Sequence, residues 1–308
     1  MRKIFAPIIL SLFVSFISQP AFSQYKTDKK LEKELKALLD SFHGTAGVYV
    51  RNLKTGKEVA INADTIFPTA SIIKVPILVG IFNKINEGAF TYHQSMLYRD
   101  SAARGGSGLM QYFKDSTKID LNVAITLMIS HSDNTAAVWC EKLAGGGVAI
   151  NSWLEQNGFQ FTRLNSRTPG REKESKEFGW GQTTPREMAN LMVMIREGKT
   201  VSEAASQQMY RNLTHVFWDE YALSQIPPYV QAASKQGMVD ASRSEAVLVN
   251  APYGDYVFYI ATKNNKDKSW KPDNEAWQLA RNVSALLWNY FEPHYGWMPA
   301  AGLEKLRY

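Results

Sequence analysis

Three short motifs, in chain order, hold the residue types of a serine nucleophile and its proton-transfer groups. They are Ser71-Ile72-Ile73-Lys74, Ser132-Asp133-Asn134 and Lys235-Gln236-Gly237. If a helix begins near Ser71, Lys74 lies on the same helix face and can take the Ser71 proton. Burial and a second nearby cation would lower the pKa of Lys74 enough for it to act as a base. The spacing therefore predicts that Ser71 is a nucleophile and that Lys74 is its base.

The second motif supplies groups for proton relay and substrate binding. Ser132 can relay a proton between Lys74 or Lys235 and a leaving nitrogen, and Asn134 can donate to a substrate amide carbonyl while it holds Lys74. Asp133 is expected to brace the turn or to cap the helix that begins around Asn134. A plain helix-start cluster would have the same composition, and both interpretations can hold together.

The third motif is expected on a strand edge beside the nucleophile. Gly237 would let a substrate backbone approach, and the Met238 amide could join that of Ser71 in an oxyanion hole. Gln236 keeps a side-chain amide that can donate to a substrate carboxylate. A further Lys-x-Gly sequence, Lys54-Thr55-Gly56, precedes the nucleophile and is interpreted as a hairpin turn.

Apolar periodicity places the elements that must position these motifs. Helices are predicted at 28–42, 75–85, 121–129, 134–143, 148–156 and 275–291, and strands at 47–51, 58–61, 246–249 and 256–262. We therefore predict an α+β (α/β-α) fold, in which an antiparallel sheet from both chain ends has flanking helices and an inserted all-helical lobe. The active site is expected at the seam between the lobes.

The chain is predicted to contain a signal peptide and one two-lobed domain. Residues 1–23 combine a basic start, an apolar run too short to span a membrane, and small residues before a cleavage site. The domain covers 24–308, with an α/β lobe at about 24–68 and 185–308 and a helical lobe at about 69–184. The protein is then periplasmic or secreted, without a stable membrane anchor after cleavage.

Composition and charge exclude several partner classes. The net charge of +6 over 308 residues is mild and no basic run is dense, so no nucleic-acid partner is expected. The one cysteine, Cys140, cannot form an internal disulfide, and the five scattered histidines give no metal pattern. We expect no cofactor and no metal, and a monomer. His131 lacks the Asp-His spacing of a Ser-His pair.

Two further segments carry specific expectations. The stretch 165–181 has no period and is interpreted as a loop. In the helix that follows, Thr184 is expected to be the N-cap, Pro185 to fill the first turn and Glu187 to complete a capping box. The aromatic residues Trp218, Tyr221 and Tyr229 are interpreted as core, with the cleft as the alternative.

From about Leu31 to Phe291 the chain resembles the class A β-lactamase family, within the penicillin-binding-protein-like serine acyl-enzyme superfamily. The three motifs match the family's set of S-x-x-K, S-D-N and K-T-G, with Gln236 in place of Thr. Other matching stretches are Phe67-Pro68-Thr69-Ala70, Gly106-Ser107-Gly108, Thr135-Ala136, Thr162-Arg163-Leu164 and Thr183-Thr184-Pro185.

The resemblance implies a β-lactamase/transpeptidase-like fold, a small-molecule β-lactam or peptide-like substrate, and a role for each motif residue. It implies an acyl-enzyme on Ser71, and it assigns proton transfer to Lys74 and Ser132 and substrate binding to Asn134 and Lys235. A strand after the Lys-x-Gly strand often supplies a second cation for the substrate carboxylate, and Arg243 stands at that place. The alternative for Arg243 is a solvated surface arginine.

The chain departs from the family in the loop that serves deacylation. In class A β-lactamases, Thr-Arg-Leu leads into Glu-Pro-x-Leu-Asn, and that Glu is the accepted deacylation residue. With Pro169 in register, Thr168 occupies the Glu position, and a hydroxyl cannot act as a carboxylate base near pH 7. Glu172, Glu174 or Glu177 could reach in from a rearranged loop, although a charged solvated loop is favoured.

Three functions follow. The first is an exported serine hydrolase of β-lactams or a related amide, with slow deacylation of penicillins. The second is a D,D-peptidase-like cell-wall enzyme that β-lactams inhibit, and the third is a non-catalytic covalent ligand sensor. The complete proton-transfer set argues against a sensor, because a binder has no need for it. The missing Glu favours the second function and the overall likeness favours the first, which we rank highest.

Overall fold

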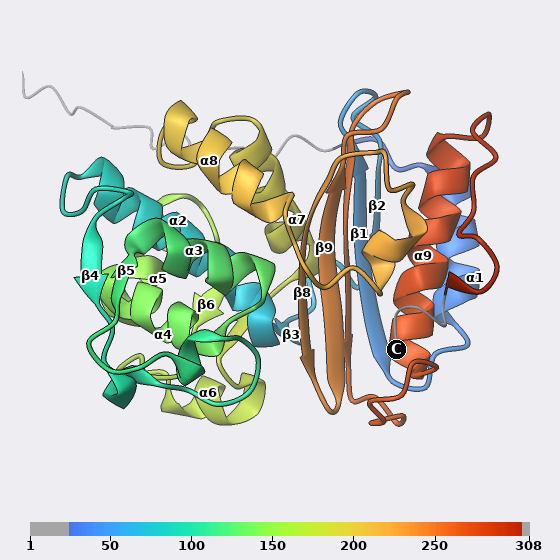
Figure 1. Cartoon of the computed structure of the whole chain (residues 1–308). Helices are drawn as coiled ribbons and strands as arrows, with labels where there is room; N and C mark the ends of the chain where they lie inside the picture. Colours follow the sequence, from blue (N-terminus) through green and yellow to red (C-terminus); the bar gives the residue numbers. More distant parts are fainter. Residues whose placement is uncertain (1–24, 304–308) are drawn as a thin grey trace, which may run out of the picture.

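A five-stranded antiparallel sheet forms the centre of the molecule (Figure 1). The computed structural model describes residues 25–303, so the predicted signal peptide lies outside the described residues. The sheet has the order β2-β1-β10-β9-β8, so both chain ends contribute strands. These strands are β1 (Thr45–Asn52), β2 (Glu58–Ile61), β8 (Ala232–Val239), β9 (Ser242–Val249) and β10 (Tyr256–Lys263). The predicted α+β fold is confirmed.

Both faces of this sheet are buried, and alternate residues serve different cores. In β10, Tyr256, Phe258 and Ile260 pack in one core, under α1 (Lys29–Leu39) and α9 (Glu275–Phe291). The intervening residues Val257, Tyr259 and Ala261 join a second core with α7 (Pro185–Arg196) and the inserted helices. Helices therefore cover both sheet faces (Figure 1).

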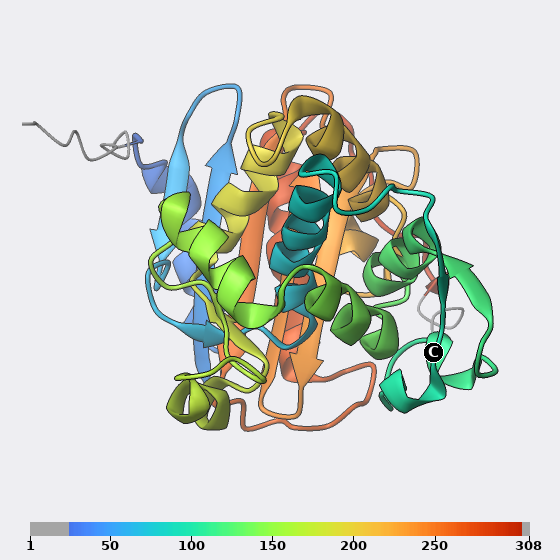
Figure 2. The same cartoon turned by 90° about the vertical axis from the view of Figure 1, so that its left-hand side faces the viewer.

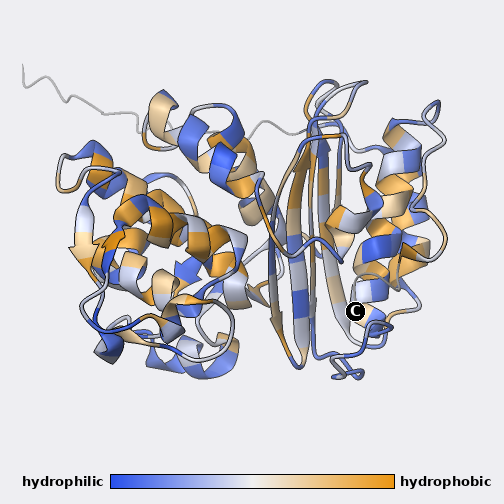
Figure 3. Cartoon of the chain, in the orientation of Figure 1, coloured by the Kyte–Doolittle hydropathy of each residue, from blue (hydrophilic) through white to orange (hydrophobic). Residues whose placement is uncertain are grey.

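The inserted lobe is built around the buried helix α2 (Lys74–Asn86), as seen in Figure 2. Its other helices are α3 (Leu121–Ser130), α4 (Asn134–Leu143), α5 (Gly146–Gln156) and α6 (Glu172–Phe178), and α8 (Glu203–Leu213) packs on α2 and α3. Figure 3 shows hydrophobic residues concentrated on α2 and α3, as expected for helices inside a core. Helix α8 has no counterpart in the sequence-based prediction.

The prediction of an all-helical inserted lobe is wrong. The hairpin of β4 (Ser95–Leu97) and β5 (Lys118–Asp120) lies within it, and β6 (Arg163–Leu164) and β7 (Gly181–Thr183) pair with β3 (Phe67–Pro68). These strands have only two or three residues, too few for a period of two to be recognisable. Four short 3₁₀ helices complete the described elements: η1 (Ala70–Ile73), η2 (Asp100–Ala102), η3 (Met110–Tyr112) and η4 (Ala222–Gln225).

The start of α7 differs from the predicted capping box. Thr184 accepts a hydrogen bond from the Glu187 amide and Pro185 occupies the first turn, as expected. The Glu187 carboxylate, however, accepts from the amides of Gln160 and Thr162, at 2.6 Å each. The Glu187 side chain therefore binds the segment before β6 to α7. The predicted Thr184 cap is confirmed, whereas the predicted return contact of Glu187 in the capping box is wrong.

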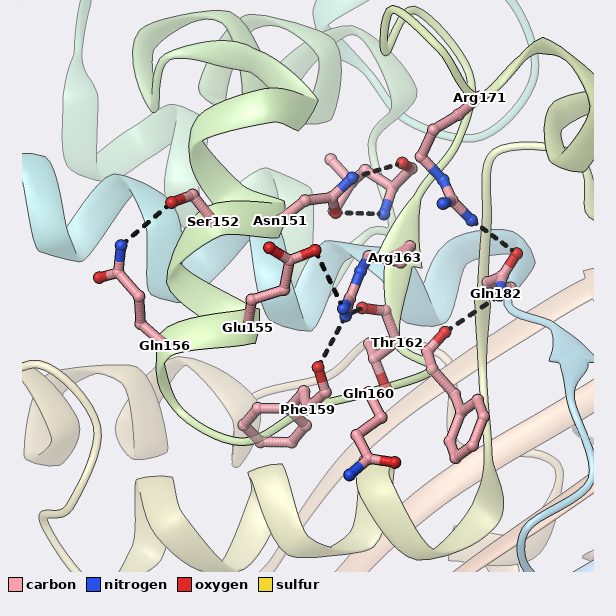
Figure 4. A network of polar contacts seen from close by, with 12 residues as sticks. Asn151, Ser152, Glu155, Gln156, Phe159, Gln160, Thr162, Arg163, Arg171 and Gln182 are labelled. Atoms are coloured by element: carbon pink, nitrogen blue, oxygen red, sulfur yellow. Dashed lines mark hydrogen bonds and ion pairs between the residues drawn. The ribbon is translucent and has the colours of Figure 1, made fainter. Parts of the chain in front are cut away.

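The stretch 165–181 is an ordered loop that carries α6. This helix has no buried residue, which explains why the sequence shows no apolar period there. Figure 4 shows polar contacts at the base of the loop: Asn151 bonds both the Leu164 amide and its carbonyl, and Arg163 binds the Phe159 carbonyl. On the other side, Arg171 donates to Gln182.

Candidate active site

Ser71 lies at the start of the helix that leads into the inserted lobe. It is the second residue of η1, which runs directly into α2, so a helix does begin at Ser71, although its first turn is 3₁₀. The preceding residue, Ala70, has a φ of +43°, a left-handed conformation that is strained for alanine. Ala70 is the first residue of η1, and Ser71 is left partly exposed at the helix N-terminus.

Lys74 is fully buried, and its amino group contacts the side chains of Ser71, Ser132 and Asn134. Its Nζ lies 3.0 Å from Ser71 Oγ, 3.1 Å from Ser132 Oγ and 2.8 Å from Asn134 Oδ1, and it donates to the Ser132 carbonyl at 2.5 Å. Burial, followed by the charge of Lys235, holds the pKa of Lys74 well below its ordinary value, against the opposing effect of Asp133. A neutral Lys74 can accept the Ser71 proton.

The Ser132-Asp133-Asn134 turn is held in place by backbone contacts. Ser132 has a φ of +54°, and Asp133 caps α4 by accepting from the Ala136 amide at 2.8 Å. The same carboxylate accepts from the Leu109 and Met110 amides, so Asp133 braces the turn as well as capping the helix. Both expectations for Asp133 are confirmed.

Strand β8 places Lys235 behind Ser132. Lys235 is fully buried, and its Nζ donates to Ser132 Oγ at 3.1 Å, to the Gln236 carbonyl at 2.9 Å and to Gln236 Oε1 at 3.3 Å. Gly237 is required by the packing of β8 on η1, because a Cβ there would lie 2.3 Å from the Thr69 carbonyl oxygen. Ser132 therefore links the two lysines, as a proton relay requires.

Glu245 is a buried acid of this site that the motifs did not reveal. It lies on β9 opposite Gln236 and accepts from Ser234 Oγ at 2.7 Å and from the Ala222 amide at 2.6 Å. Burial raises the pKa of Glu245 to about 7, and burial lowers the pKa of Lys235 to about 7 while Glu245 opposes that change. The sequence did carry one signal for Glu245: it is the one acidic residue in β9, and no charged residue follows it in that strand.

Two hollows meet at Ser71, and Asn134 and Met238 also line both. One, of about 540 Å³, is here called the aromatic arm. It is lined by Ser71, Ser107, Ser132, Asn134, Trp218, Glu220, Tyr221, Gln236, Gly237, Met238, Trp270 and Trp277. The other, of about 550 Å³, is called the loop arm and includes Glu177, Phe178, Gly179, Trp180 and Lys263.

The interpretation as core is wrong for Trp218 and Tyr229, whereas Tyr221 is buried and also lines the cleft. Trp218 and Tyr221 line the aromatic arm, although Tyr221 is only 8% exposed. Tyr229 is 68% exposed and lines a separate hollow beside Trp297. All three follow α8 in an irregular segment, where no periodicity separates core from cleft. His131 stacks on Phe217, with 5.0 Å between the ring centroids.

Arg243 is buried rather than solvated, so the surface alternative is wrong. Its guanidinium lies 4.6 Å from the Trp270 ring centroid and 5.1 Å from that of Trp277. It donates to the carbonyls of Ser242 and Ser269. Arg243 is not among the described residues that line the aromatic arm, and its role as a second cation for a substrate carboxylate stays a prediction.

The loop brings one carboxylate to the rim of the loop arm. Thr168, at the position expected for Glu, is buried, and its Oγ lies 3.5 Å from the Ser166 carbonyl. Of the three acidic residues considered, Glu177 lines the loop arm, whereas Glu172 accepts from the Gly170 amide. That Glu177 supplies a carboxylate for deacylation stays a prediction.

Trp180 forms the wall of the loop arm beside Lys74. The Lys74 Nζ lies 5.4 Å from the Trp180 ring centroid, and the Trp180 indole N–H donates to Glu141 Oε2 at 3.0 Å. Arg167 donates to the same Glu141 oxygen at 2.6 Å and lies over the Trp180 ring at 5.0 Å. Glu141 was also missed by the sequence analysis, because a single acid in a helix carries no motif.

A partly exposed serine, a buried lysine with a lowered pKa and a bridging second serine, in this α+β fold, define a serine hydrolase of the β-lactamase type. A sequence profile of the beta-lactamase enzyme family matches residues 30–291. The chain belongs to this family.

Individual relatives agree with this assignment. Beta-lactamase VEB-1 of Pseudomonas aeruginosa is 22% identical over 297 residues, which cover 92% of this chain and 96% of the relative. A beta-lactamase of Streptomyces fradiae is 24% identical over 83% of this chain and 84% of its own. The solved structure of PBP-A is similar with a TM-score of 0.77 and 26% identity, covering 87% of this chain and 98% of PBP-A.

Proposed function

We propose that this chain is an exported serine hydrolase that forms an acyl-enzyme on Ser71 with β-lactams or related amides and releases penicillins slowly. The contact between Lys74 Nζ and Ser71 Oγ, at 3.0 Å, carries the proposal, because it joins a nucleophile to a base of lowered pKa. Lys74 takes the Ser71 proton as Ser71 attacks the substrate carbonyl. The amides of Ser71 and Met238 stabilise the oxyanion, and Asn134 binds the substrate amide.

Ser132 then delivers a proton to the leaving nitrogen. Its Oγ lies 3.1 Å from the Nζ of both Lys74 and Lys235, so either lysine can resupply the proton. The buried Lys235 also disfavours a charge on Lys74, which keeps the base neutral. Within this proposal, Gln236 and Gly237 contribute to the wall on which the substrate lies.

Slow deacylation follows from the groups around the loop arm. Thr168 supplies no carboxylate, and the buried carboxylate of Glu141 is already bound by Arg167 and Trp180. Water attack on a penicilloyl ester then depends on Lys74 or on Glu177. A point mutant of PBP-A has been solved as an acyl-enzyme complex with penicillin G, and we expect an adduct of that kind here.

Intact-mass analysis after mixing with benzylpenicillin tests this proposal. We expect a stoichiometric adduct that lasts for hours, together with turnover of smaller or non-cyclic amides and esters. Ser71→Ala should abolish the adduct, whereas Ser107→Ala, which alters another serine of the cleft, should retain it. Persistent labelling of Ser71→Ala would contradict the nucleophile assignment, and rapid benzylpenicillin turnover would contradict slow deacylation.

A D,D-peptidase-like activity is the second candidate, favoured by the threonine at position 168. Release of D-alanine from a stem-peptide analogue, with loss of that activity on penicillin treatment, would support it. The complete contacts among Ser71, Lys74 and Ser132 disfavour a non-catalytic sensor.

We also propose that the signal peptide is removed after Ser23, that the mature protein is periplasmic or secreted and monomeric, and that 69–184 forms the inserted lobe. No helix among residues 25–303 is long and apolar enough to cross a membrane. N-terminal sequencing of the exported protein should begin at Gln24. Light scattering of the mature protein should give the mass of one chain.

A further inference from the structure

We propose that Trp180, positioned by Glu141, keeps the water of the loop arm away from Lys74 and thereby prolongs the life of an acyl-enzyme on Ser71. The inference rests on the proposed function and deepens it, because it names a residue that sets the rate of deacylation. A threonine at position 168 removes one base from the site, whereas Lys74 remains as a base that water could use.

The amino group of Lys74 is surrounded by three polar side chains and by the ring of Trp180. Its Nζ contacts oxygens of Ser71, Ser132 and Asn134, and it lies 5.4 Å from the Trp180 ring centroid. Lys74 is fully buried and is not among the described residues that line either arm, whereas Ser71 and Trp180 both line the loop arm. Water in the loop arm can therefore reach Ser71, but it meets the Trp180 ring in place of the base.

The Trp180 residue is held through its side chain and through its backbone. The indole N–H donates to Glu141 Oε2 at 3.0 Å, and Arg167, which donates to the same oxygen at 2.6 Å, lies 5.0 Å from the ring centroid. The Trp180 carbonyl accepts from the amides of Asn165 and Ser166, at 2.8 Å and 3.2 Å. Glu141 is buried, and hydrogen bonds to a charged acceptor are strong. These contacts oppose a movement of the ring that would admit water.

Deacylation through Lys74 requires a water molecule beside this amino group. Lys74 is neutral again after acylation, once the Ser71 proton has reached the leaving nitrogen through Ser132. The water would give a proton to Lys74 Nζ while its oxygen attacks the ester carbonyl carbon. Collapse of the intermediate breaks the bond between that carbon and Ser71 Oγ, which takes the proton back from Lys74. Trp180 blocks the first of these steps, because a site closed to water protects a reactive intermediate from hydrolysis.

The lifetime of the penicilloyl adduct in Trp180 variants tests the inference. The adduct is formed with benzylpenicillin, the free compound is removed, and the decay is followed by intact mass. Trp180→Ala opens the space beside Lys74 and should shorten the lifetime by about tenfold, whereas Trp180→Phe keeps a ring there and should stay within about threefold of the parent. Shortening by less than about threefold in Trp180→Ala, or an equal shortening in both variants, would overturn the inference.

The pH dependence of the decay separates access to Lys74 from a general loosening of the loop. In Trp180→Ala, hydrolysis through Lys74 should rise with pH and level off above the lowered pKa of this lysine. The charged groups that act on Lys74, Lys235 on β8 and Asp133 before α4, are the same in the parent and in the variant. A rate that follows the hydroxide concentration without a plateau would overturn the inference, because Trp180 would then only order the loop.

A pair of variants at Glu141 tests the position of the ring while Trp180 is retained. Glu141→Ala removes the acceptor of the indole N–H and should shorten the lifetime of the adduct. Glu141→Gln keeps an oxygen acceptor and should restore most of the parent lifetime. An adduct that lasts equally long in Glu141→Ala and in the parent would overturn the positioning role of Glu141. This pair also retains the test if Trp180→Ala does not fold.

The inference and the proposed function fail in different ways. A parent protein that forms no adduct would refute the acyl-enzyme and, with it, the ester that Trp180 is inferred to protect. Rapid hydrolysis by the parent, with Trp180 in place, would contradict both slow deacylation and the exclusion of water. A long-lived parent adduct that lasts equally long in Trp180→Ala would leave slow deacylation intact and refute the inference alone.

Discussion

The two arms of the cleft share Ser71 but differ in how their walls are held. The aromatic arm is lined by residues of β8, by Trp277 from α9 and by Tyr221 just before η4. Its walls therefore belong to the five-stranded sheet and to the elements that pack on that sheet. The loop arm includes residues 177–180, whose position depends on ion pairs and side-chain to backbone bonds. The comparison teaches that the lysines proposed to serve acylation lie in the buried core of the fold, whereas the side proposed to serve deacylation is held by a polar loop.

Replacement of Lys74 should have the largest effect, and this effect should be on the acylation rate. Lys74→Ala removes the base and should lower the acylation rate by about 10²–10⁴-fold, the usual contribution of general-base catalysis. Lys84→Ala, on the same helix but forming an exposed ion pair with Glu87, is the control and should acylate at the parent rate. Stopped-flow measurement with a chromogenic cephalosporin gives both rates. A parent-like rate for Lys74→Ala would show that another group is the base.

Changes at Thr168, in the loop beside the loop arm, should affect deacylation. Thr168→Glu should raise penicilloyl-ester hydrolysis by about 10²-fold if the loop register is right, since it adds a general base. Thr168→Gln adds a side chain of similar size to glutamate without a basic carboxylate, so it should leave the adduct long-lived. The lifetime of the adduct is followed by intact mass.

Glu177→Gln separates two explanations of any residual hydrolysis by the parent. If Glu177 activates water from the loop arm, hydrolysis falls in Glu177→Gln and persists in Glu172→Gln, because Glu172 is bonded within the loop. Equal rates in both variants would leave Lys74 as the remaining base. A loss confined to Glu172→Gln would show that the loop moves on acylation.

The pH dependence of the acylation rate should show how Lys235 affects the pKa of Lys74. Acylation needs neutral Lys74, so the rate should fall as the pH drops below the lowered pKa of this group and reach a plateau above it. Lys235→Gln removes a positive charge that lowers this pKa, so the acidic limb should move to higher pH. The acylation rate is measured across the acidic and neutral range with the same cephalosporin. An acidic limb that does not move in Lys235→Gln would show that Lys235 does not lower the pKa of Lys74.

The smallest expected effect is on stability. Glu141→Gln removes the buried charge that binds Arg167 and Trp180, and should lower the free energy of unfolding by about 1–3 kcal/mol. Urea denaturation monitored by circular dichroism measures this change. Glu203→Gln, at the exposed start of α8, is the control and should alter stability by about 0.5 kcal/mol or less. A silent Glu141→Gln would show that the pair contributes little to the loop.

The sequence predicted those parts of the molecule in which local pattern and final structure agree. The central sheet strands near the chain ends and α9 were recognisable because their apolar residues repeat with a regular period. The motif residues were recognisable because the members of each motif lie within a few positions of one another, at the start of α2, at the start of α4 and on β8.

Long-range partners explain what was not predicted. Arg243 became buried because two tryptophans from distant segments cover it. Glu187 turned away from its capping box because three amides before β6 lie within its reach. Neither partner set is visible in a window of neighbouring residues. The contacts of Glu141 and Glu245 depend in the same way on the folded arrangement.

The attachment of the loop by Glu187 has a consequence for proteolysis. The segment after β6 carries four trypsin sites, Arg167, Arg171, Lys173 and Lys176, and α6 has no buried residue to protect it. Its protection in the native state depends on fixed ends, and Glu187 fixes the first of these through the amides of residues 160–162. The rate of tryptic nicking within 167–176 thus reports how often this end detaches, independently of any ligand or chemistry in the cleft.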